Sequence, residues 1–396
     1  MRITPSQAIE RLIGGRKRAK GASPIVLAHT EKHSRVDRLF VFEIGEGFVV
    51  TPADDKLAPV IGVCDGNAFD AEDVPPGLGD WLSGLAKEIA WHQAHEGEEP
   101  VQMDAGPGRR TVAPMVEARW NQTSPYNRNL NFGDGACYVG CCAVAMAEIM
   151  HHWQVADPSM FWAGCAALPA YKTTTKKYQV AALPAVARFD FANMTAGKPK
   201  TSAQINAVAQ FLEYVAKSVK SDFETTGTGA YNSACVTALT KYFRMGSPKQ
   251  QLSSSMKAVK FEEIVYSELA AGRPLFMSGA KSANAGGHSF VCDGYDATSG
   301  LFHFNWGWGG SCDGYFALNA LTPTGKDYSF NKRIITGIMP SLLGDVNGDG
   351  KVNVSDVMAV VNSITAGKYD VVADVNGDGK VDTRDVNAIV NKILNA

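Results

Sequence analysis

Residues 139–152 read VGCCAVAMAEIMHH, and this stretch places two adjacent cysteines at the head of an apolar run. The run that follows Cys141 and Cys142 predicts a buried helix that begins at these cysteines. The positive end of a helix dipole favours a thiolate, which is the nucleophilic form of cysteine. Neighbouring residues on a helix point about 100° apart. At most one of the two cysteines can therefore face a cleft, and this stretch alone does not say which one.

The composition is that of an ordinary globular protein. A length of 396 residues allows two or three domains. Apolar residues make up 45%, charged residues 20%, and the net charge is -2. There is no basic excess, so we expect no nucleic-acid partner. No run reaches the roughly 18 apolar residues that a membrane helix needs, so we expect no membrane span.

The opening MRITPSQAIE lacks the apolar core of a signal peptide. The eight cysteines are too few for a disulfide scaffold.

The chain divides into three predicted segments, 1–110, 111–340 and 343–396. In the first, LFVFEIGEGFVVTP (39–52) predicts two strands joined at its glycines, and GDWLSGLAKEIAWHQ (79–93) predicts a helix. We therefore expect a small α+β unit. It ends in EGEEPVQMDAGPGRRT (96–111), which we predict to be an exposed linker. Such a linker, with Arg109 and Arg110 at its end, is where a protease would cut.

The third segment contains a repeat that predicts calcium binding. DVNGDGKVNVSD begins at residue 345 and DVNGDGKVDTRD at residue 374, a period of 29 (374 minus 345). Each copy places oxygen side chains at positions 1, 3, 5, 9 and 12, a glycine at position 6, and at position 7 a residue whose main-chain carbonyl can bind. A hard cation needs six to eight oxygens. The predicted ligands are Asp345, Asn347, Asp349, Lys351, Asn353 and Asp356 in the first loop, and Asp374, Asn376, Asp378, Lys380, Asp382 and Asp385 in the second.

A nucleophilic cysteine needs a base and a group that orients the base. His151 and His152 share the predicted cysteine helix but lie too far along it, and four other histidines fall in the first segment. His288 and His303 are left, and both stay possible at this point. His288 follows Cys141 by 147 residues (288 minus 141), and Asn305 lies further on, an order compatible with papain-like Cys, His and Asn.

An acyl-transfer site also needs donors for the oxyanion. Gln122, in WNQTSPYN (120–127), offers an amide that could join the backbone N–H of Cys141. A zinc site is disfavoured, because the cysteines and histidines near position 141 show neither CxxC nor HxxxH spacing.

The middle segment resembles the streptopain family of bacterial papain-like cysteine peptidases, which includes interpain. The resemblance is carried by WNQTSPYN, GCCAVAMAEIM, GGHSFVCDGYD, HFNWGWGGSCDGYFALNAL and ITGIMP, in that order over about residues 112–340. It implies a papain-like α+β fold of two subdomains, with a catalytic helix packed on an antiparallel sheet. Because the family's nucleophile directly follows a glycine, the resemblance selects Cys141 over Cys142. It also implies that His288 is the base, Asn305 its orienter, Gln122 the oxyanion donor and Trp306 a shield over the pair.

The flanking segments carry resemblances of their own. Residues 25–95 are similar to the streptopain pro-domain, so we expect an inhibitory segment that is removed by a cut between Glu96 and Met115; the alternative is a permanent accessory domain. Residues 343–396 closely resemble a type I dockerin, a helical calcium-binding module whose partner is a cohesin domain. The alternative for this tail is a module that calcium stabilises but that has no protein partner.

Together these patterns predict a secreted cysteine endopeptidase zymogen whose signal peptide is absent from this sequence. Its substrates would be proteins or peptides, and catalysis would need no cofactor. Two alternatives stay open, an acyltransferase of the transglutaminase kind and an inactive scaffold displayed through the dockerin. Cys137, Cys142 and Cys312 depart from the family pattern, and a disulfide with Cys141 would make activity redox-dependent.

Overall fold

The computed structural model describes residues 1–14, 22–95, 108–158, 163–246, 248–280, 287–319, 332–347, 351–367, 369–370 and 372–395. The chain forms two compact units, each built from two stretches of sequence. Unit 1 comprises Met1–Arg119 and Gln251–Ile334, and unit 2 comprises Trp120–Gln250 and Ile335–Ala396. Within the described ranges, no helix is both long and apolar enough to cross a bilayer.

The first segment of unit 1 is the predicted α+β unit. It contains α1 (Pro5–Leu12), β1 (Ile25–His33), β2 (Val36–Ile44), β3 (Gly47–Pro52), β4 (Gly62–Cys64) and α2 (Pro76–Ala94). The predicted strand pair is confirmed, because β2 and β3 pair antiparallel from Leu39 opposite Pro52 to Ile44 opposite Gly47. Gly45 has φ 66° in the turn between them, a conformation that glycine adopts without a steric penalty.

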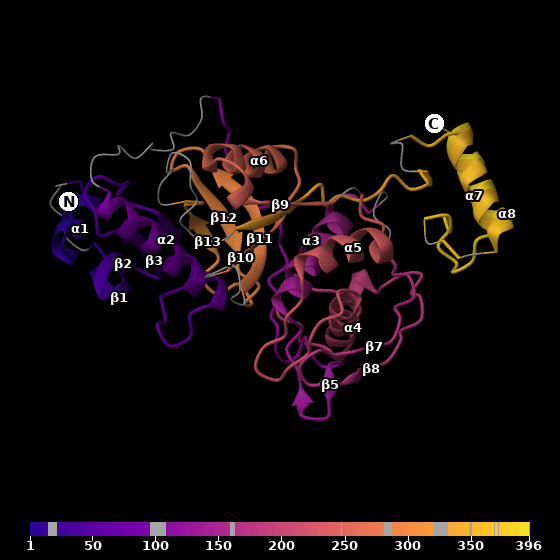
Figure 1. Ribbon diagram of the computed structural model, residues 1–396, viewed down its shortest axis with the longest axis horizontal. Helices are drawn as coiled ribbons and strands as arrows, with labels where there is room; N and C mark the ends of the chain where they lie inside the picture. Colours follow the sequence, from indigo (N-terminus) through magenta and orange to yellow (C-terminus); the bar gives the residue numbers. More distant parts are fainter. Residues whose placement is uncertain are drawn as a thin grey trace. The chain divides into compact units, whose positions relative to one another are not determined.

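The sheet of the first segment continues into strands from the second. Unit 1 also holds α6 (Ala258–Ala270), β10 (Leu275–Ala280), β11 (Gly287–Asp296), β12 (Leu301–Asn305) and β13 (Gly314–Phe316). With β14 (Arg333–Thr336) and β9 (Lys249–Leu252), the sheet order is β1-β2-β3-β4-β13-β12-β11-β10-β14-β9. β4 pairs with β13, so a strand of the first segment is hydrogen-bonded directly to a strand of the second. Figure 1 shows the indigo and orange parts of the sheet.

Helix α2 packs on the strands that the second segment contributes. The Trp81 ring is 1% exposed and lies edge-on to Phe290 and Phe304, with centroids 5.8 and 4.9 Å away. Its Nε1 donates a hydrogen bond of 3.2 Å to the carbonyl of Ala317. A Cβ on Gly77 would lie 3.0 Å from the Trp306 ring, so a larger residue in this first turn of α2 would require the ring to shift. Both helices of this face, α2 and α6, share one core with the strands.

The end of the predicted linker differs from expectation. Most of the linker, 96–107, lies outside the described residues, but Arg109 is described and its side chain is only 12% exposed. Its guanidinium pairs with Glu262 of α6. The prediction of an exposed arginine pair is therefore wrong for Arg109, because a buried carboxylate and aromatic rings provide a site for its side chain.

Unit 2 contains the cysteine helix. Its main elements are α3 (Cys141–Ala156), α4 (Ser202–Ser218) and α5 (Asn232–Phe243), with short hairpins β5–β6 (Asn131–Phe132, Gly135–Ala136) and β7–β8 (Tyr171–Lys172, Gln179–Val180). The predicted helix after Cys141 is confirmed, and it packs on α4 and α5. His151 lies against the Trp120 ring, and burial lowers its pKa to about 4. It is thus a neutral core residue at physiological pH.

The third segment folds as two loop-and-helix repeats. The helices are α7 (Val354–Ala366) and α8 (Thr383–Leu394), each beginning directly after its loop as the repeat predicts. Asn353 and Asp382, the ninth loop residues, cap the two helices by accepting backbone N–H bonds from Ser355 and Arg384. The two repeats share a small apolar core that includes Val360 and Ile389.

We predict that Trp81→Ala lowers the free energy of unfolding by about 3–5 kcal/mol, because it leaves a cavity between α2 and the sheet. Urea unfolding followed by circular dichroism would measure the change. Trp91→Ala, at a half-buried position near the end of the same helix, is the control and should cost less than half as much. Equal losses from the two variants would contradict this view of the α2 interface.

Candidate active site

Cys141 is the first residue of α3, and the residue before it has to be glycine. Gly140 has φ 96°, and a Cβ there would lie 3.1 Å from the Thr228 side chain and 3.2 Å from the Thr228 carbonyl. The left-handed backbone at Gly140 turns the chain into the helix. Cys141 thus stands in the first turn of α3, where the partial positive charge of the helix N-terminus favours a thiolate.

Cys141 is more exposed than the other cysteines. All eight lie in the described part of the chain; seven are buried, and Cys141 is half-buried. The Cys142 thiol lies 3.6 Å from the Ala230 carbonyl, inside unit 2. Burial raises the pKa of the Cys137 thiol and raises the pKa of Cys312 to about 11. That a disulfide with Cys141 makes activity redox-dependent stays a prediction.

Gln122 is held next to the start of α3. It is 6% exposed, and its carbonyl accepts a hydrogen bond of 2.9 Å from the backbone of Val139, two residues before Cys141. The main-chain pairing thus fixes the predicted oxyanion donor beside the segment that leads to the predicted nucleophile. This part of the site lies wholly in unit 2.

His288 lies in unit 1, on the sheet face that α2 covers. It stands on β11 with Phe290 and Cys292 on the same face, and both of these belong to the core that Trp81 joins. His288 Nε2 is 3.9 Å from a carboxylate oxygen of Asp80, one residue before Trp81. The first segment therefore places a carboxylate beside the predicted catalytic base.

Asn305 and Trp306 follow each other at the end of β12. Asn305 is 1% exposed; its amide nitrogen donates to the Ala118 carbonyl at 2.8 Å, and its oxygen accepts from the backbone of Gly307 at 3.0 Å. Trp306 packs on Phe290, with ring centroids 4.8 Å apart. The backbone thus holds the Asn305 amide firmly, and its predicted pairing with His288 stays a prediction.

An aspartate that the sequence reasoning missed explains the second histidine. Asp293 is fully buried on β11; one oxygen lies 2.6 Å from Nδ1 of His303 and the other accepts from the backbone of Val116 at 2.8 Å. This places His303 in a buried structural pair. The signal was available, because a charged residue within the apolar stretch SFVCDGY needs a buried partner.

Asp313 supports the strand end that carries Asn305 and Trp306. Its carboxylate accepts a hydrogen bond of 2.9 Å from the backbone N–H of Trp306. Burial raises the pKa of Asp313 to about 6, and the guanidinium of Arg119 lies 3.6 Å from its other oxygen. Asp313 therefore helps to fix the backbone at the end of β12.

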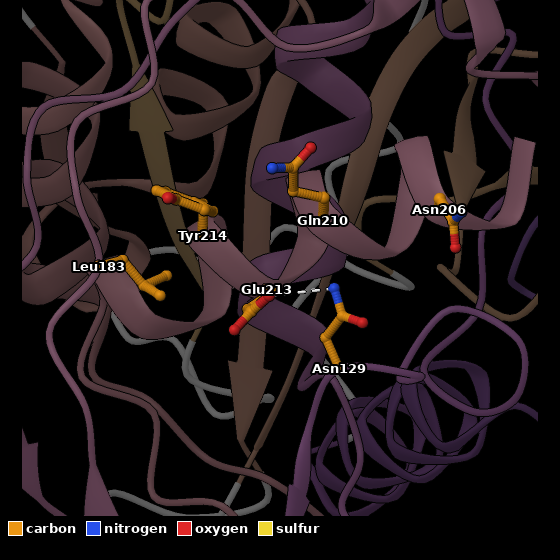
Figure 2. Close-up of a pocket in the computed structure, with 6 residues that line it drawn as sticks. All are labelled: Asn129, Leu183, Asn206, Gln210, Glu213 and Tyr214. Atoms are coloured by element: carbon orange, nitrogen blue, oxygen red, sulfur yellow. Dashed lines mark hydrogen bonds between the residues drawn. The ribbon is translucent and has the colours of Figure 1, made fainter. Parts of the chain in front are cut away.

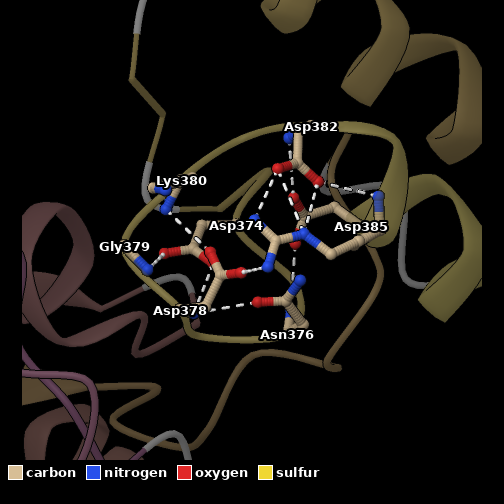
Figure 3. Close-up of polar contacts among 8 residues, drawn as sticks. Asp374, Asn376, Asp378, Gly379, Lys380, Asp382 and Asp385 are labelled. Atoms are coloured by element: carbon tan, nitrogen blue, oxygen red, sulfur yellow. Dashed lines mark hydrogen bonds and ion pairs between the residues drawn. The ribbon is translucent and has the colours of Figure 1, made fainter.

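The second repeat loop is described in full, and its oxygens line the inner side of the loop backbone (Figure 3). Asp374 accepts hydrogen bonds from the backbones of Asp378 and Gly379, and Asp385 accepts from those of Asn376 and Asp382. Among the described residues, no group of three or more His, Cys, Asp or Glu side chains is arranged to hold a metal ion. The donor set is nevertheless all oxygen, which suits calcium.

The first loop is described in part, since 348–350, and so the predicted ligand Asp349, lie outside the described residues. Asp356 is the twelfth residue of the first loop and corresponds to Asp385 in the second. It is fully buried, with oxygens that accept from the backbones of Val346, Asn347 and Asn353. The twelfth loop residue thus closes both loops in the same way.

A separate hollow of about 380 Å³ lies on α4 and contains none of the predicted catalytic residues. It is lined by Asn129, Leu183, Asn206, Gln210, Glu213 and Tyr214 (Figure 2). The amide of Asn129 donates to Glu213, which also pairs with Lys217. One pair of its polar lining groups, Asn129 and Glu213, is therefore already hydrogen-bonded to each other.

Comparison with known families assigns each segment. A model of the peptidase C10 family matches residues 120–316. Residues 120–316 belong to the peptidase C10 family. A dockerin type I model matches residues 343–394, and a model described as Spi protease inhibitor matches residues 11–89. The predicted cysteine peptidase with a pro-domain-like first segment and a dockerin tail is thereby confirmed at the level of family.

Two relatives of the chain agree with this family assignment. The thiol protease/hemagglutinin PrtT of Porphyromonas gingivalis is 30% identical over 334 residues, which cover 76% of this chain and 37% of that protein. Streptopain of Streptococcus pyogenes is 23% identical, covering 72% of this chain and 75% of its own length. The chain thus spans little more than a third of the first relative and three quarters of the second.

A solved structure shows the same fold. A fragment of prointerpain A from Prevotella intermedia superimposes with a TM-score of 0.67 at 23% identity, covering 80% of this chain and 99% of the fragment. The predicted papain-like α+β fold is confirmed. The roles of Cys141, His288, Asn305, Gln122 and Trp306 are proposals that the geometry of each unit supports separately.

We predict that Gly140→Ala lowers peptide hydrolysis by the activated enzyme about 100-fold, because the new Cβ meets Thr228 and displaces Cys141. Gly133→Ala is the matched control, since a Cβ there meets nothing within 4 Å. Hydrolysis of a fluorogenic peptide would measure both variants. Equal activities would show that Gly140 does not position the nucleophile.

Proposed function

We propose that this protein is a cysteine endopeptidase zymogen in which Cys141 is the nucleophile and His288 the base. The observation that carries the proposal is the state of Cys141, the cysteine that is half-buried at a helix start while the other seven are buried. A position that is both accessible and electropositive is what a thiolate nucleophile needs.

The proposed reaction is the hydrolysis of a peptide bond in two steps. His288 accepts the proton of Cys141, and the thiolate attacks the substrate carbonyl carbon. The backbone N–H of Cys141 and the amide of Gln122 stabilise the oxyanion, and His288 returns the proton to the leaving amine. Water, deprotonated by His288, then hydrolyses the thioester and frees Cys141. Asn305 orients the imidazole and Trp306 shields the pair.

The first segment keeps the enzyme latent in this proposal. Its helix α2 covers the sheet face that carries His288, and Asp80 lies beside the imidazole. In this proposal, the contact with Asp80 restrains the imidazole and so lowers the reactivity of Cys141. Removal of the first segment would free His288, which is why the proposed activation step is proteolytic.

The tail is proposed to bind two calcium ions and, through them, to present a surface to a cohesin domain. The ligands would be the predicted loop residues, with Asp356 and Asp385 closing the loops. Exposed apolar side chains at Val354, Met358 and Val361 lie three and four residues apart on α7, which gives the module an apolar stripe. Calcium would stabilise the loops and so the orientation of the helices.

The proposed place of action is outside the cell. Three features support it: the dockerin match, the two calcium loops and the bacterial peptidases to which the chain is similar. The substrates would be proteins or peptides, in line with the peptidase family.

The decisive test is to map the reactive thiol. The protein would be activated with reductant, treated with an epoxide inhibitor of papain-like peptidases and examined by mass spectrometry. We expect labelling at Cys141 that is lost in His288→Ala and kept in Cys142→Ser. Labelling at Cys142 or Cys137 would move the nucleophile, and no labelling after removal of the first segment would favour the inactive scaffold. Cross-linked rather than cleaved peptide products would favour the acyltransferase.

We predict that Asp385→Asn reduces calcium binding from two ions per chain to one, because it removes the charged residue that closes the second loop. Isothermal titration calorimetry on the intact chain would count the ions. Asp370→Asn, just outside the loop, is the control and should leave two. Two ions bound by both variants would exclude Asp385 as a ligand.

A further inference from the structure

Several contacts on unit 1 hold the Arg109 side chain. Its Nη1 lies 2.5 Å from an oxygen of Glu262, whose side chain is 7% exposed. The guanidinium also lies over the rings of Tyr266 and Tyr295, 4.8 and 5.7 Å from their centroids. An ion pair together with cation–π contacts fixes an arginine much more firmly than a single surface contact does.

The residues after Arg109 are bonded to the same helix and sheet. The backbone N–H of Arg110 donates to the Tyr266 hydroxyl at 2.8 Å. Val112 and Tyr295 exchange backbone hydrogen bonds of 2.7 and 2.8 Å, and Met115 donates to the Asp293 carbonyl at 3.2 Å. The segment Arg109–Ala118, which we call the strap, thus follows β11.

The far end of the strap reaches the proposed catalytic strands. Val116 donates to the Asp293 carboxylate that pairs with His303, and the Ala118 carbonyl accepts the Asn305 amide. The strap therefore contacts β11, which carries His288, and the side chain of Asn305 itself. A cut within its first residues would release the end that Arg109 and Glu262 hold.

We propose that Arg109 and Glu262 form an anchor that keeps the strap on the peptidase, so that neither the Arg109–Arg110 bond nor the Arg110–Thr111 bond is the activating cut. This rests on the proposed zymogen, since it concerns which bond activation breaks. A protease binds its substrate as an extended, exposed chain, whereas here the Arg109 side chain is only 12% exposed and ion-paired with Glu262, and the backbones of Arg110 and Val112 are hydrogen-bonded.

The test uses a Cys141→Ala chain, which cannot process itself, digested with an added arginine-specific peptidase. Mass spectrometry would follow new N-termini at Arg110 and Thr111. Glu262→Gln removes the charge of the anchor with little change of shape. Glu263→Gln is the matched control, because Glu263 is the next residue of α6 and is exposed, paired with Lys260.

We expect slow cutting at both bonds in the parent chain, at least about tenfold faster cutting in Glu262→Gln, and no change in Glu263→Gln. Rapid cutting of the parent chain, or equal rates in the two variants, would overturn the anchor. Because the peptidase is added, this digest gives its answer even if the protein itself proves inactive.

A second measurement uses the active chain. After activation, N-terminal sequencing of the mature enzyme should show that Arg109 is retained. A mature enzyme that begins at Arg110 or Thr111 would overturn the inference while leaving the proposed peptidase activity intact. An enzyme that never processes would instead contradict the proposed function, so the two failures are distinguishable.

Discussion

The packing of α2 on the sheet is the interaction on which unit 1 depends. Trp81 fills the space between the first segment and the strands β11 and β12, and Gly77 lets the first turn of α2 approach Trp306 closely. The same helix places Asp80 beside His288. The packing of one helix therefore contributes to the core of the unit and also places a charged group beside the proposed base.

The two parts of the proposed site follow different physical rules. In unit 2, the position of Cys141 is set by local backbone: a left-handed glycine and the start of a helix. In unit 1, the positions of His288 and Asn305 are set by non-local contacts, from α2 on one face of the sheet and from the strap along β11. A nucleophile fixed locally and a base fixed by a removable segment suit a zymogen, because the base can be regulated without rebuilding the nucleophile.

Much of this was predictable from the sequence. The hairpin at Gly45, the helix around Trp81, the helix after Cys141 and both tail helices follow from local periodicity and turn residues, which act over a few positions. The preference for Cys141 over Cys142 came from family resemblance, and burial now supports it from a separate direction.

The remainder depends on contacts between distant residues, which periodicity does not report. Nothing near Asp80 indicates that it lies beside His288, and nothing near Asp293 names His303 as its partner. Arg109 was misjudged for the same reason: a Gly- and Pro-rich stretch predicts exposure, but Glu262 lies far along the chain. The one available signal was a charged residue within an apolar strand.

The most direct test of the account is the rate at which Cys141 reacts with the epoxide in the uncut chain. If α2 restrains His288 through Asp80, Asp80→Asn should raise this rate about two- to fivefold without cleavage, as expected for the loss of a partly exposed ion pair. Asp73→Asn, an exposed change in the same segment, should leave it unchanged. Equal rates in all three uncut chains, with fast labelling once the first segment is removed, would contradict a role for Asp80 in restraining the base.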